Sequence, residues 1–142
     1  MKKKTVHKSV VLIVNSLWNA INYRTNLVKS LSKKYKVTII AEKDIDNFDL
    51  YLRNLNCDFI NLKFNSRGIN PIKELFSFIK LVISLKRTNP DAILSFTIKP
   101  NIYSSLIARL FCCPIINNIS GLGLYFSYNK FLKKIINFLY YV

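Results

Sequence analysis

Apolar residues in this chain gather in short runs, separated by longer segments in which apolar positions follow helical spacing. The runs have the length of β-strands and are nearly continuous, as is typical of strands that are buried on both faces of a parallel sheet. We therefore expect five parallel strands. They are predicted at residues 9–14, 36–41, 57–64, 92–96 and 114–119.

The clearest helical segment spans residues 71–87. Pro71 marks its start and Asn89-Pro90 marks its end, because proline opens a helix readily but cannot continue one. Apolar positions form a broad stripe along this helix, and mostly lysines, serines and an arginine lie on the other side. The stripe consists of Ile72, Leu75, Phe76, Ile79, Val82 and Ile83.

Three further helices are predicted, at residues 23–34, 46–54 and 101–111. Asp46 or Asn47 would cap the second of them. The last has a row of small residues, which favours either close packing against a sheet or the close approach of a ligand. This row consists of Asn101, Ser104, Ser105, Ala108 and Cys112.

The alternation of strands and helices predicts an α/β domain with a doubly wound, Rossmann-like parallel sheet. With right-handed crossovers the strand order is expected to be 3-2-1-4-5, so that a crevice opens where the first and fourth strands lie side by side. The loops that would line this crevice are residues 15–22 after the first strand and 97–101 after the fourth, with 120–126 after the fifth beside them.

Charge narrows the classes of partner. The 142 residues carry a formal net charge of +15, and all seven acidic residues fall between Glu42 and Asp91. A basic surface favours partners that carry phosphate, namely a nucleic acid, an anionic membrane surface or a diphosphate substrate. An overall compositional preference for Lys, Asn, Ile, Phe and Tyr could account for part of this bias. No nucleic-acid reader motif is present, so specific nucleic-acid binding is not expected.

Several chemistries are disfavoured by what the chain lacks. His7 is the only histidine, and the spacing of Cys57, Cys112 and Cys113 matches no zinc, redox or disulfide pattern. We expect no bound metal and no cofactor. No GxGxxG or Walker A loop is present, which argues against dinucleotide binding. The chain also has no window of about 18 to 20 uninterrupted apolar residues, although it could lie on a membrane surface.

The segment after the first strand offers the first candidate binding residues. Asn15 and Asn22 can hydrogen-bond to hydroxyl groups, and Trp18 can stack on the apolar face of a sugar or insert among lipid headgroups. A half-buried packing role for Trp18 is equally compatible with the sequence. Arg24 could pair with a phosphate.

A second group of candidates follows the fourth and fifth strands. Lys99 and Asn101 flank Pro100, which is predicted to open a helix whose free N–H groups face the crevice and would favour an anion. A surface lysine at a proline turn is the alternative. Gly121 and Gly123 are two of only three glycines in the chain, so they mark either a close ligand approach or an ordinary turn.

Four motifs, in this order, resemble the N-terminal domain of family 4 glycosyltransferases. The closest group is the bacterial enzymes that extend lipid-linked sugars for capsule, O-antigen or glycan assembly. The motifs are Asn15-x-x-Trp18-x-x-x-Asn22-x-Arg24, Arg67-Gly68-Ile69-Asn70-Pro71, Thr97-Ile98-Lys99-Pro100-Asn101-Ile102-Tyr103 and Asn117-Asn118-Ile119-Ser120-Gly121-Leu122-Gly123. Many relatives have glycines where this chain has Ser16 and Asn19.

The resemblance implies one half of a GT-B architecture, which consists of two Rossmann-like domains. The N-terminal domain receives the acceptor, here a polyprenyl-diphosphate-linked saccharide, and the other domain binds the nucleotide-sugar donor. The resemblance further implies hexosyl transfer with retained anomeric configuration, no obligatory metal, and attachment to the cytoplasmic face of the plasma membrane. Asn15, Trp18, Asn22, Arg24, Lys99, Asn101, Gly121 and Gly123 are the acceptor-binding candidates, and the catalytic residues remain unassigned.

This resemblance suggests three parts of the chain. Residues 1–8 would form a basic lead, residues 9–128 the Rossmann-like domain, and residues 129–142 a basic amphipathic helix that begins the linker to a second domain outside this chain. On this hypothesis the 142 residues are inactive alone. The alternative is a non-catalytic scaffold at the membrane surface that recruits a separate donor-binding subunit.

Overall fold

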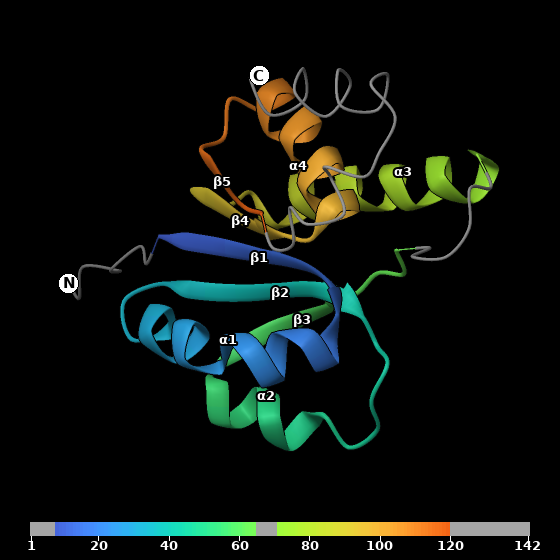
Figure 1. The fold of residues 1–142 in the computed structure, drawn as a ribbon. Coiled ribbons are helices and arrows are strands. Elements are labelled where there is room, and N and C mark those ends of the chain that lie inside the picture. Colours follow the sequence, from blue (N-terminus) through green and yellow to red (C-terminus); the bar gives the residue numbers. More distant parts are fainter. Residues whose placement is uncertain (1–7, 65–70, 120–142) are drawn as a thin grey trace.

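The computed structural model describes residues 8–64 and 71–119. They form a five-stranded sheet between two pairs of helices (Figure 1). The strands are β1 (Ser9–Ser16), β2 (Lys36–Glu42), β3 (Cys57–Asn61), β4 (Ala92–Phe96) and β5 (Ile115–Asn118). The helices are α1 (Leu17–Ser32), α2 (Asp49–Leu55), α3 (Pro71–Thr88) and α4 (Ile98–Leu110).

All strand pairings are parallel, and the order is β3-β2-β1-β4-β5. The predicted fold class and strand order are therefore confirmed. The connection from β3 to β4 passes over β2 and β1, so the carboxyl ends of β1 and β4 lie side by side at the point where the strand order reverses. In the matched register, Ser95 of β4 lies between Ile13 of β1 and Asn117 of β5.

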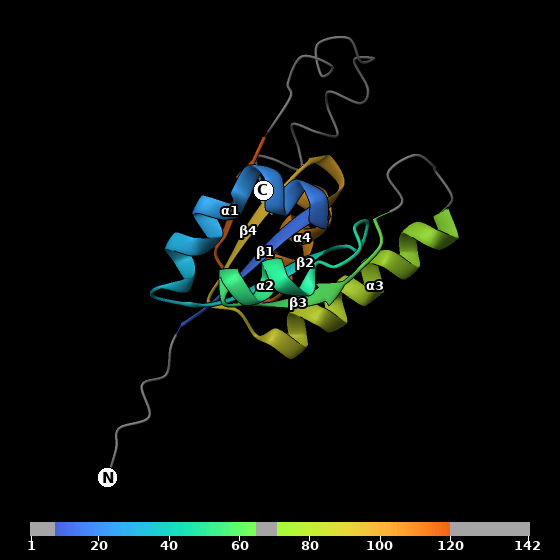
Figure 2. The same ribbon diagram turned by 90° about the horizontal axis from the view of Figure 1, so that it is seen from below.

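Two apolar cores lie on opposite faces of the sheet, and β1 contributes alternate residues to each. Leu12 and Val14 belong to the core under α1 and α2, whereas Val11 and Ile13 belong to the core under α3 and α4. Figures 1 and 2 show these helix pairs on the two faces. This double burial explains why the strand-forming runs are apolar at successive positions.

The first helix begins six residues earlier than the sequence predicts. Ser16 caps it, because its hydroxyl oxygen accepts a hydrogen bond from the Asn19 backbone N–H at 3.1 Å. The predicted loop at residues 15–22 is therefore mostly the first turns of α1. β3 ends earlier than predicted, although Leu62 and Phe64 beyond it are buried in the core under α3 and α4.

The predicted cap of the second helix is wrong. Phe48 occupies the N-cap position of α2 without a side-chain cap bond, and the helix starts at Asp49, beyond both Asp46 and Asn47. The predicted start of α4 is also displaced. The helix begins at Ile98, and Pro100 lies within its first turn, where a missing N–H costs no helical hydrogen bond.

Most of the predicted apolar stripe of α3 lies on the outer face of the helix, and only Val82 of that stripe packs against the core under α3 and α4. An amphipathic helix on a sheet ordinarily buries such a stripe. Here the fully buried residues of α3 are Leu81 and Leu85, while Glu74, Ser77 and Phe78 are partly buried beside them. The exposed apolar residues on the opposite side are Ile72, Leu75, Phe76, Ile79 and Ile83.

The predicted loop at residues 120–126 and the predicted helix at residues 129–142 lie outside the described residues. Within the described ranges, none of the helices has the length and apolar content needed to cross a membrane.

Candidate functional site

The junction between β1 and α1 places polar groups at the carboxyl end of the central strand. Asn15 is partly buried, and its Oδ1 atom is buried without a hydrogen-bond partner. Ser16 is occupied as the helix cap. The Trp18 backbone N–H donates to Asp44 Oδ1 at 2.9 Å. Two backbone N–H groups at the amino end of α1, those of Trp18 and Asn19, are thus bound by this chain's own side chains, and Asn15 retains unused hydrogen-bonding capacity.

Trp18 and Asn22 lie on the exposed surface of the first turns of α1. The Trp18 side chain is 46% exposed and meets Tyr23 edge-on, with ring centroids 5.6 Å apart. Asn22 Nδ2 donates to the Trp18 carbonyl oxygen at 2.9 Å. The predicted amide is therefore engaged with its own helix, while Trp18 presents an aromatic surface beside the carboxyl edge of the sheet.

Arg24 connects α1 to the end of β4. Its guanidinium lies over the Phe96 ring, 4.2 Å from the centroid, and Nη1 donates to Asn19 Oδ1 at 2.7 Å. Burial lowers the Arg24 pKa from its ordinary value. The Nε atom is buried without a hydrogen-bond partner. A buried guanidinium donor of this kind favours an incoming anion, because phosphate oxygens accept strongly from arginine.

The end of β4 carries two further unsatisfied groups that the sequence-based prediction missed. Ser95 is fully buried, and neither its Oγ atom nor the buried Oγ1 atom of Thr97 has a hydrogen-bond partner. Thr97 adopts a φ of 73°, a region that is costly for a β-branched residue. Its side chain makes no cap bond to α4. The positive end of the α4 dipole therefore meets a strained, polar turn.

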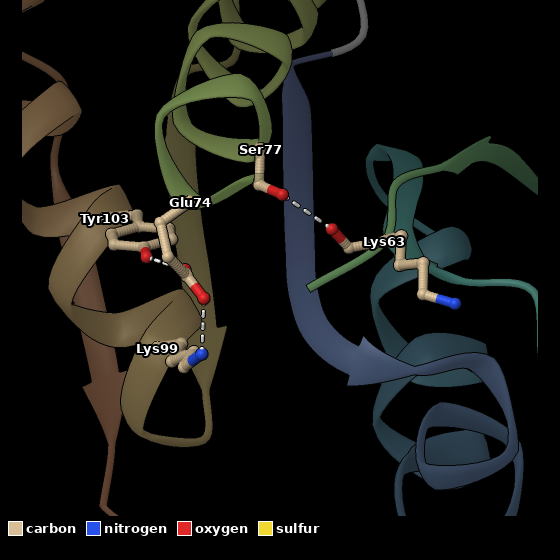
Figure 3. A network of polar contacts seen from close by, with 5 residues as sticks. All are labelled: Lys63, Glu74, Ser77, Lys99 and Tyr103. Carbon is tan, nitrogen blue, oxygen red and sulfur yellow. Dashed lines mark hydrogen bonds and ion pairs between the residues drawn. The ribbon is translucent and has the colours of Figure 1, made fainter. Parts of the chain in front are cut away.

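Lys99 lies in the first turn of α4 and is paired with an acidic residue of α3. Its Nζ atom is 2.6 Å from Glu74 Oε1, and the Tyr103 hydroxyl donates to the other oxygen of the same carboxylate (Figure 3). Both contacts hold the Glu74 pKa below its ordinary value despite its partial burial. Burial, together with the Glu74 carboxylate, raises the Tyr103 pKa. Much of the Lys99 charge is therefore balanced within the chain.

The row of small residues on α4 packs closely against β5. Asn101 is buried, and its Nδ2 atom donates to the Asn118 carbonyl oxygen at 3.1 Å. Asn117 Nδ2 donates to Ser105 Oγ at 2.8 Å, which leaves the buried Oδ1 atom of Asn117 without a partner. The predicted role of Asn101 in an acceptor site is not tested by these contacts, which give it a clear structural role.

Buried polar side-chain atoms that lack a partner thus gather along neighbouring carboxyl ends in the described part of the chain. They belong to Asn15, Arg24, Ser95, Thr97 and Asn117. Such atoms are uncommon in folded proteins, because each costs desolvation without a compensating bond. Residues 8–64 and 71–119 contain no cluster of three or more His, Cys, Asp or Glu side chains that could hold a metal ion. The arrangement suits a neutral polar or anionic ligand.

Comparison with known proteins identifies the family. The protein-family model described as glycosyl transferase 4-like matches residues 10–142. The chain belongs to this glycosyl transferase 4-like family. This match confirms the family that the sequence motifs predicted. The more specific prediction, an enzyme of capsule or O-antigen assembly, stays a prediction. A search of curated protein sequences found no match.

Solved structures place this family member in the GT-B fold. It resembles MurG from Acinetobacter baumannii with a TM-score of 0.60 at 19% identity, covering 80% of this chain and 36% of that one. A glycosyltransferase from Rickettsia africae gives a TM-score of 0.60 at 18% identity, covering 90% and 35%. A protein described as UDP-N-acetylglucosamine 2-epimerase from Listeria monocytogenes gives 0.63 at 15% identity, covering 90% and 36%.

The glycosyl transferase 4-like chain therefore spans about a third of the length of these three structures. Its described residues form one Rossmann-like half of a GT-B fold, and the polar carboxyl edge lies at the switch point of the strand order. Ligands bind at such switch points in open α/β sheets. Gly121 and Gly123 lie outside the described residues, so their predicted contribution to this edge stays a prediction.

Proposed function

We propose that this chain is the acceptor-binding half of a GT-B glycosyltransferase. The observation that carries the proposal is the row of buried, unpartnered polar atoms on Asn15, Arg24, Ser95, Thr97 and Asn117 at the switch point. Membership of the glycosyl transferase 4-like family supports a sugar-transfer reaction. The polar edge supplies what the acceptor side of that reaction requires, which is a set of groups that bind hydroxyl and phosphate oxygens.

The unpartnered atoms divide by chemistry into two sets. The amide oxygens of Asn15 and Asn117 can only accept hydrogen bonds, so they suit donors such as the hydroxyl groups of a sugar. Arg24 Nε can only donate, so it requires an acceptor such as a phosphate oxygen. The hydroxyls of Ser95 and Thr97 can do either. A phosphorylated saccharide satisfies both sets.

We assign the diphosphate of the acceptor to Arg24 and to the amino end of α4. That end of the helix dipole favours an anion. Lys99 is less well suited than the sequence predicts, because Glu74 already balances its charge. Trp18 is exposed beside this edge and provides a surface for stacking on a sugar. Asn22, Asn101, Gly121 and Gly123 complete the predicted site.

The proposed acceptor is a polyprenyl-diphosphate-linked saccharide, as in the assembly of capsule or O-antigen. Donor binding is assigned to a second Rossmann-like domain, in the same protein or in a separate subunit, and no metal or cofactor is required. The basic net charge of +15 supports a peripheral position on the anionic, cytoplasmic face of the plasma membrane.

Intrinsic fluorescence offers a direct test, because Trp18 is the only tryptophan and lies beside the proposed site. Polyprenyl diphosphate in detergent micelles is titrated into the 142-residue chain, with the matching polyprenol as the uncharged reference. We expect the diphosphate to change Trp18 emission and to bind at least about tenfold more tightly than the polyprenol, the equivalent of one charge-assisted hydrogen bond.

Arg24→Gln is expected to weaken diphosphate binding by about tenfold, because it removes the unpartnered guanidinium donor. Arg53→Gln is the matched control, since Arg53 is an exposed arginine of α2. Loss of binding in both variants would indicate general charge attraction and would contradict the site. Equal affinity for the diphosphate and the polyprenol would contradict it as well.

A further inference from the structure

The outer face of α3 is apolar from Ile72 to Ile83. Its large apolar side chains are between 44% and 65% exposed, and they recur at the three- and four-residue spacing that places them on one side of a helix. They are Ile72, Leu75, Phe76, Ile79 and Ile83. We call this set the α3 stripe. Contiguous exposed apolar surface of this kind usually marks an interaction site.

Basic residues run beside the α3 stripe. Lys73, Lys80 and Arg87 are exposed and recur every seventh residue, so they form a row along one border of the stripe. Lys86 adds a further exposed basic side chain in the last turn. The one acidic residue of the helix, Glu74, is turned inward and paired with Lys99. The outward surface of α3 therefore combines apolar and positive groups.

The α3 stripe begins at the edge of the sheet that carries the candidate site. Glu74 of α3 contacts Lys99 and Tyr103 of α4, and Ser77 Oγ donates to the Lys63 carbonyl oxygen at 2.9 Å (Figure 3). These contacts hold the first turns of α3 between the first turns of α4 and the segment after β3. Ile72, Leu75 and Phe76 are exposed in the same turns.

We infer that the outer face of α3 docks on an anionic lipid bilayer. An interfacial helix has large apolar side chains that enter the headgroup region and lysines or arginines that meet anionic lipid, and the outer face of α3 has both. Protein interfaces, in contrast, are depleted of lysine relative to the rest of the surface, whereas this face carries Lys73, Lys80 and Lys86 beside its apolar residues. This inference rests on the proposed function and extends it, because docking through α3 would hold a lipid-linked acceptor at the adjacent polar edge.

Vesicle co-sedimentation of the 142-residue chain tests the inference without any acceptor. We expect the chain to bind vesicles of phosphatidylcholine mixed with phosphatidylglycerol and to bind phosphatidylcholine alone much more weakly. Replacing Phe76 and Ile79 together by serine should lower the partition coefficient by about tenfold or more, because two large apolar side chains no longer enter the lipid. Lys80→Glu should lower it specifically for vesicles that contain phosphatidylglycerol.

The matched control replaces Leu50 and Tyr51 of α2 together by serine. These two side chains are 67% and 53% exposed, on a helix that covers the other face of the sheet. This variant should bind like the parent chain. The inference is overturned if the α3 variant binds vesicles as well as the parent, if the α2 variant loses as much, or if the parent binds no vesicles. A dimer interface is the other outcome that overturns the inference. In that case the parent chain would be a dimer, and the α3 variant would be a monomer that binds vesicles as well as the parent does.

Thermal unfolding of each variant separates lost binding from lost folding. The fluorescence titration in detergent separates this inference from the proposed function. Normal diphosphate binding with no vesicle binding would overturn the role of α3 alone, whereas vesicle binding with no diphosphate preference would contradict the acceptor site alone.

Discussion

The carboxylate of Glu74 on α3 binds two side chains of α4. It accepts hydrogen bonds from Lys99 and Tyr103, and its own side chain is only 18% exposed. An ion pair with this much burial is worth more than a fully exposed one, although solvent still screens Lys99. The contact therefore fixes the first turn of α4 relative to α3, and with it the turn at Thr97.

Glu74→Gln should destabilise the fold by about 1 kcal/mol at neutral pH, because it removes the ion pair. The Glu74 pKa is lower in the folded chain than its ordinary value of 4.5. The stabilisation is therefore fully present above the unfolded-state pKa and is lost as the pH falls through the folded-state pKa. Urea unfolding at neutral and at acidic pH should show the difference between parent and variant shrinking in acid.

Glu42→Gln is the control for this prediction. Glu42 pairs with Lys63 at 3.0 Å, but the Lys63 side chain is 75% exposed, so the pair should contribute less to stability. An equal loss in both variants, or a Glu74→Gln effect that persists unchanged in acid, would contradict the role assigned to the Glu74 carboxylate.

Sequence reasoning at this scale selected Asn15, Arg24 and Lys99 as candidates, because amides and basic residues that follow parallel strands are recognisable, and their binding roles stay predictions. It missed the partner of Lys99, since Glu74 is 25 residues away and its proximity depends on how α3 packs against α4. Ser95 and Thr97 were missed because neither residue type signals a ligand. Their unpartnered hydroxyls become visible only when the surrounding chain is in place.

At the scale of elements, apolar periodicity predicts that α3 exists but not which side of it faces the sheet. The apolar stripe is longer than the buried face, which consists mainly of Leu81 and Leu85. A helix orients by the packing of all its neighbours, here Phe78 against Tyr103 and Ser77 against the segment after β3. The start of α1 was also predicted wrongly. The sequence pattern did not identify Ser16 as the N-cap residue of this helix.

Two alanine substitutions on α3 separate its faces. Leu81→Ala should destabilise the fold by about 2–5 kcal/mol, because it leaves a cavity in the core under α3 and α4. Ile79→Ala, only two residues away and 44% exposed, should cost about 0.5 kcal/mol or less. Urea unfolding of both variants measures the contrast, and equal costs would mean that the helix is rotated.

For the whole molecule, the sequence predicts the strand order correctly, because five apolar runs joined by helices leave few right-handed arrangements. The strand order does not tell whether the 142-residue chain can transfer a sugar by itself. Its length is about a third of the three GT-B structures compared above. We propose that the groups that bind a nucleotide-sugar belong to a second Rossmann-like half, in the same protein or in a separate subunit.

The 142-residue chain alone should therefore transfer no sugar from a nucleotide-sugar to a polyprenyl-diphosphate acceptor. Radiolabelled donors of several sugars, supplied with the acceptor in detergent, measure this directly. Transfer by the purified chain with no added protein would contradict the assignment of donor binding to another domain. A chain with Arg24→Gln serves to show whether any observed transfer depends on the proposed site.

The double burial of β1 has a consequence for how this protein can change. A strand with apolar residues on both faces remains apolar after a slip of one residue, so its apolar pattern alone fixes the register only weakly. The penalty for slippage falls instead on the polar residues that end the strand, Asn15 and Ser16. On the proposed function, Asn15 would serve both ligand recognition and strand alignment, so a substitution there that alters ligand preference would put the alignment of the central strand at risk.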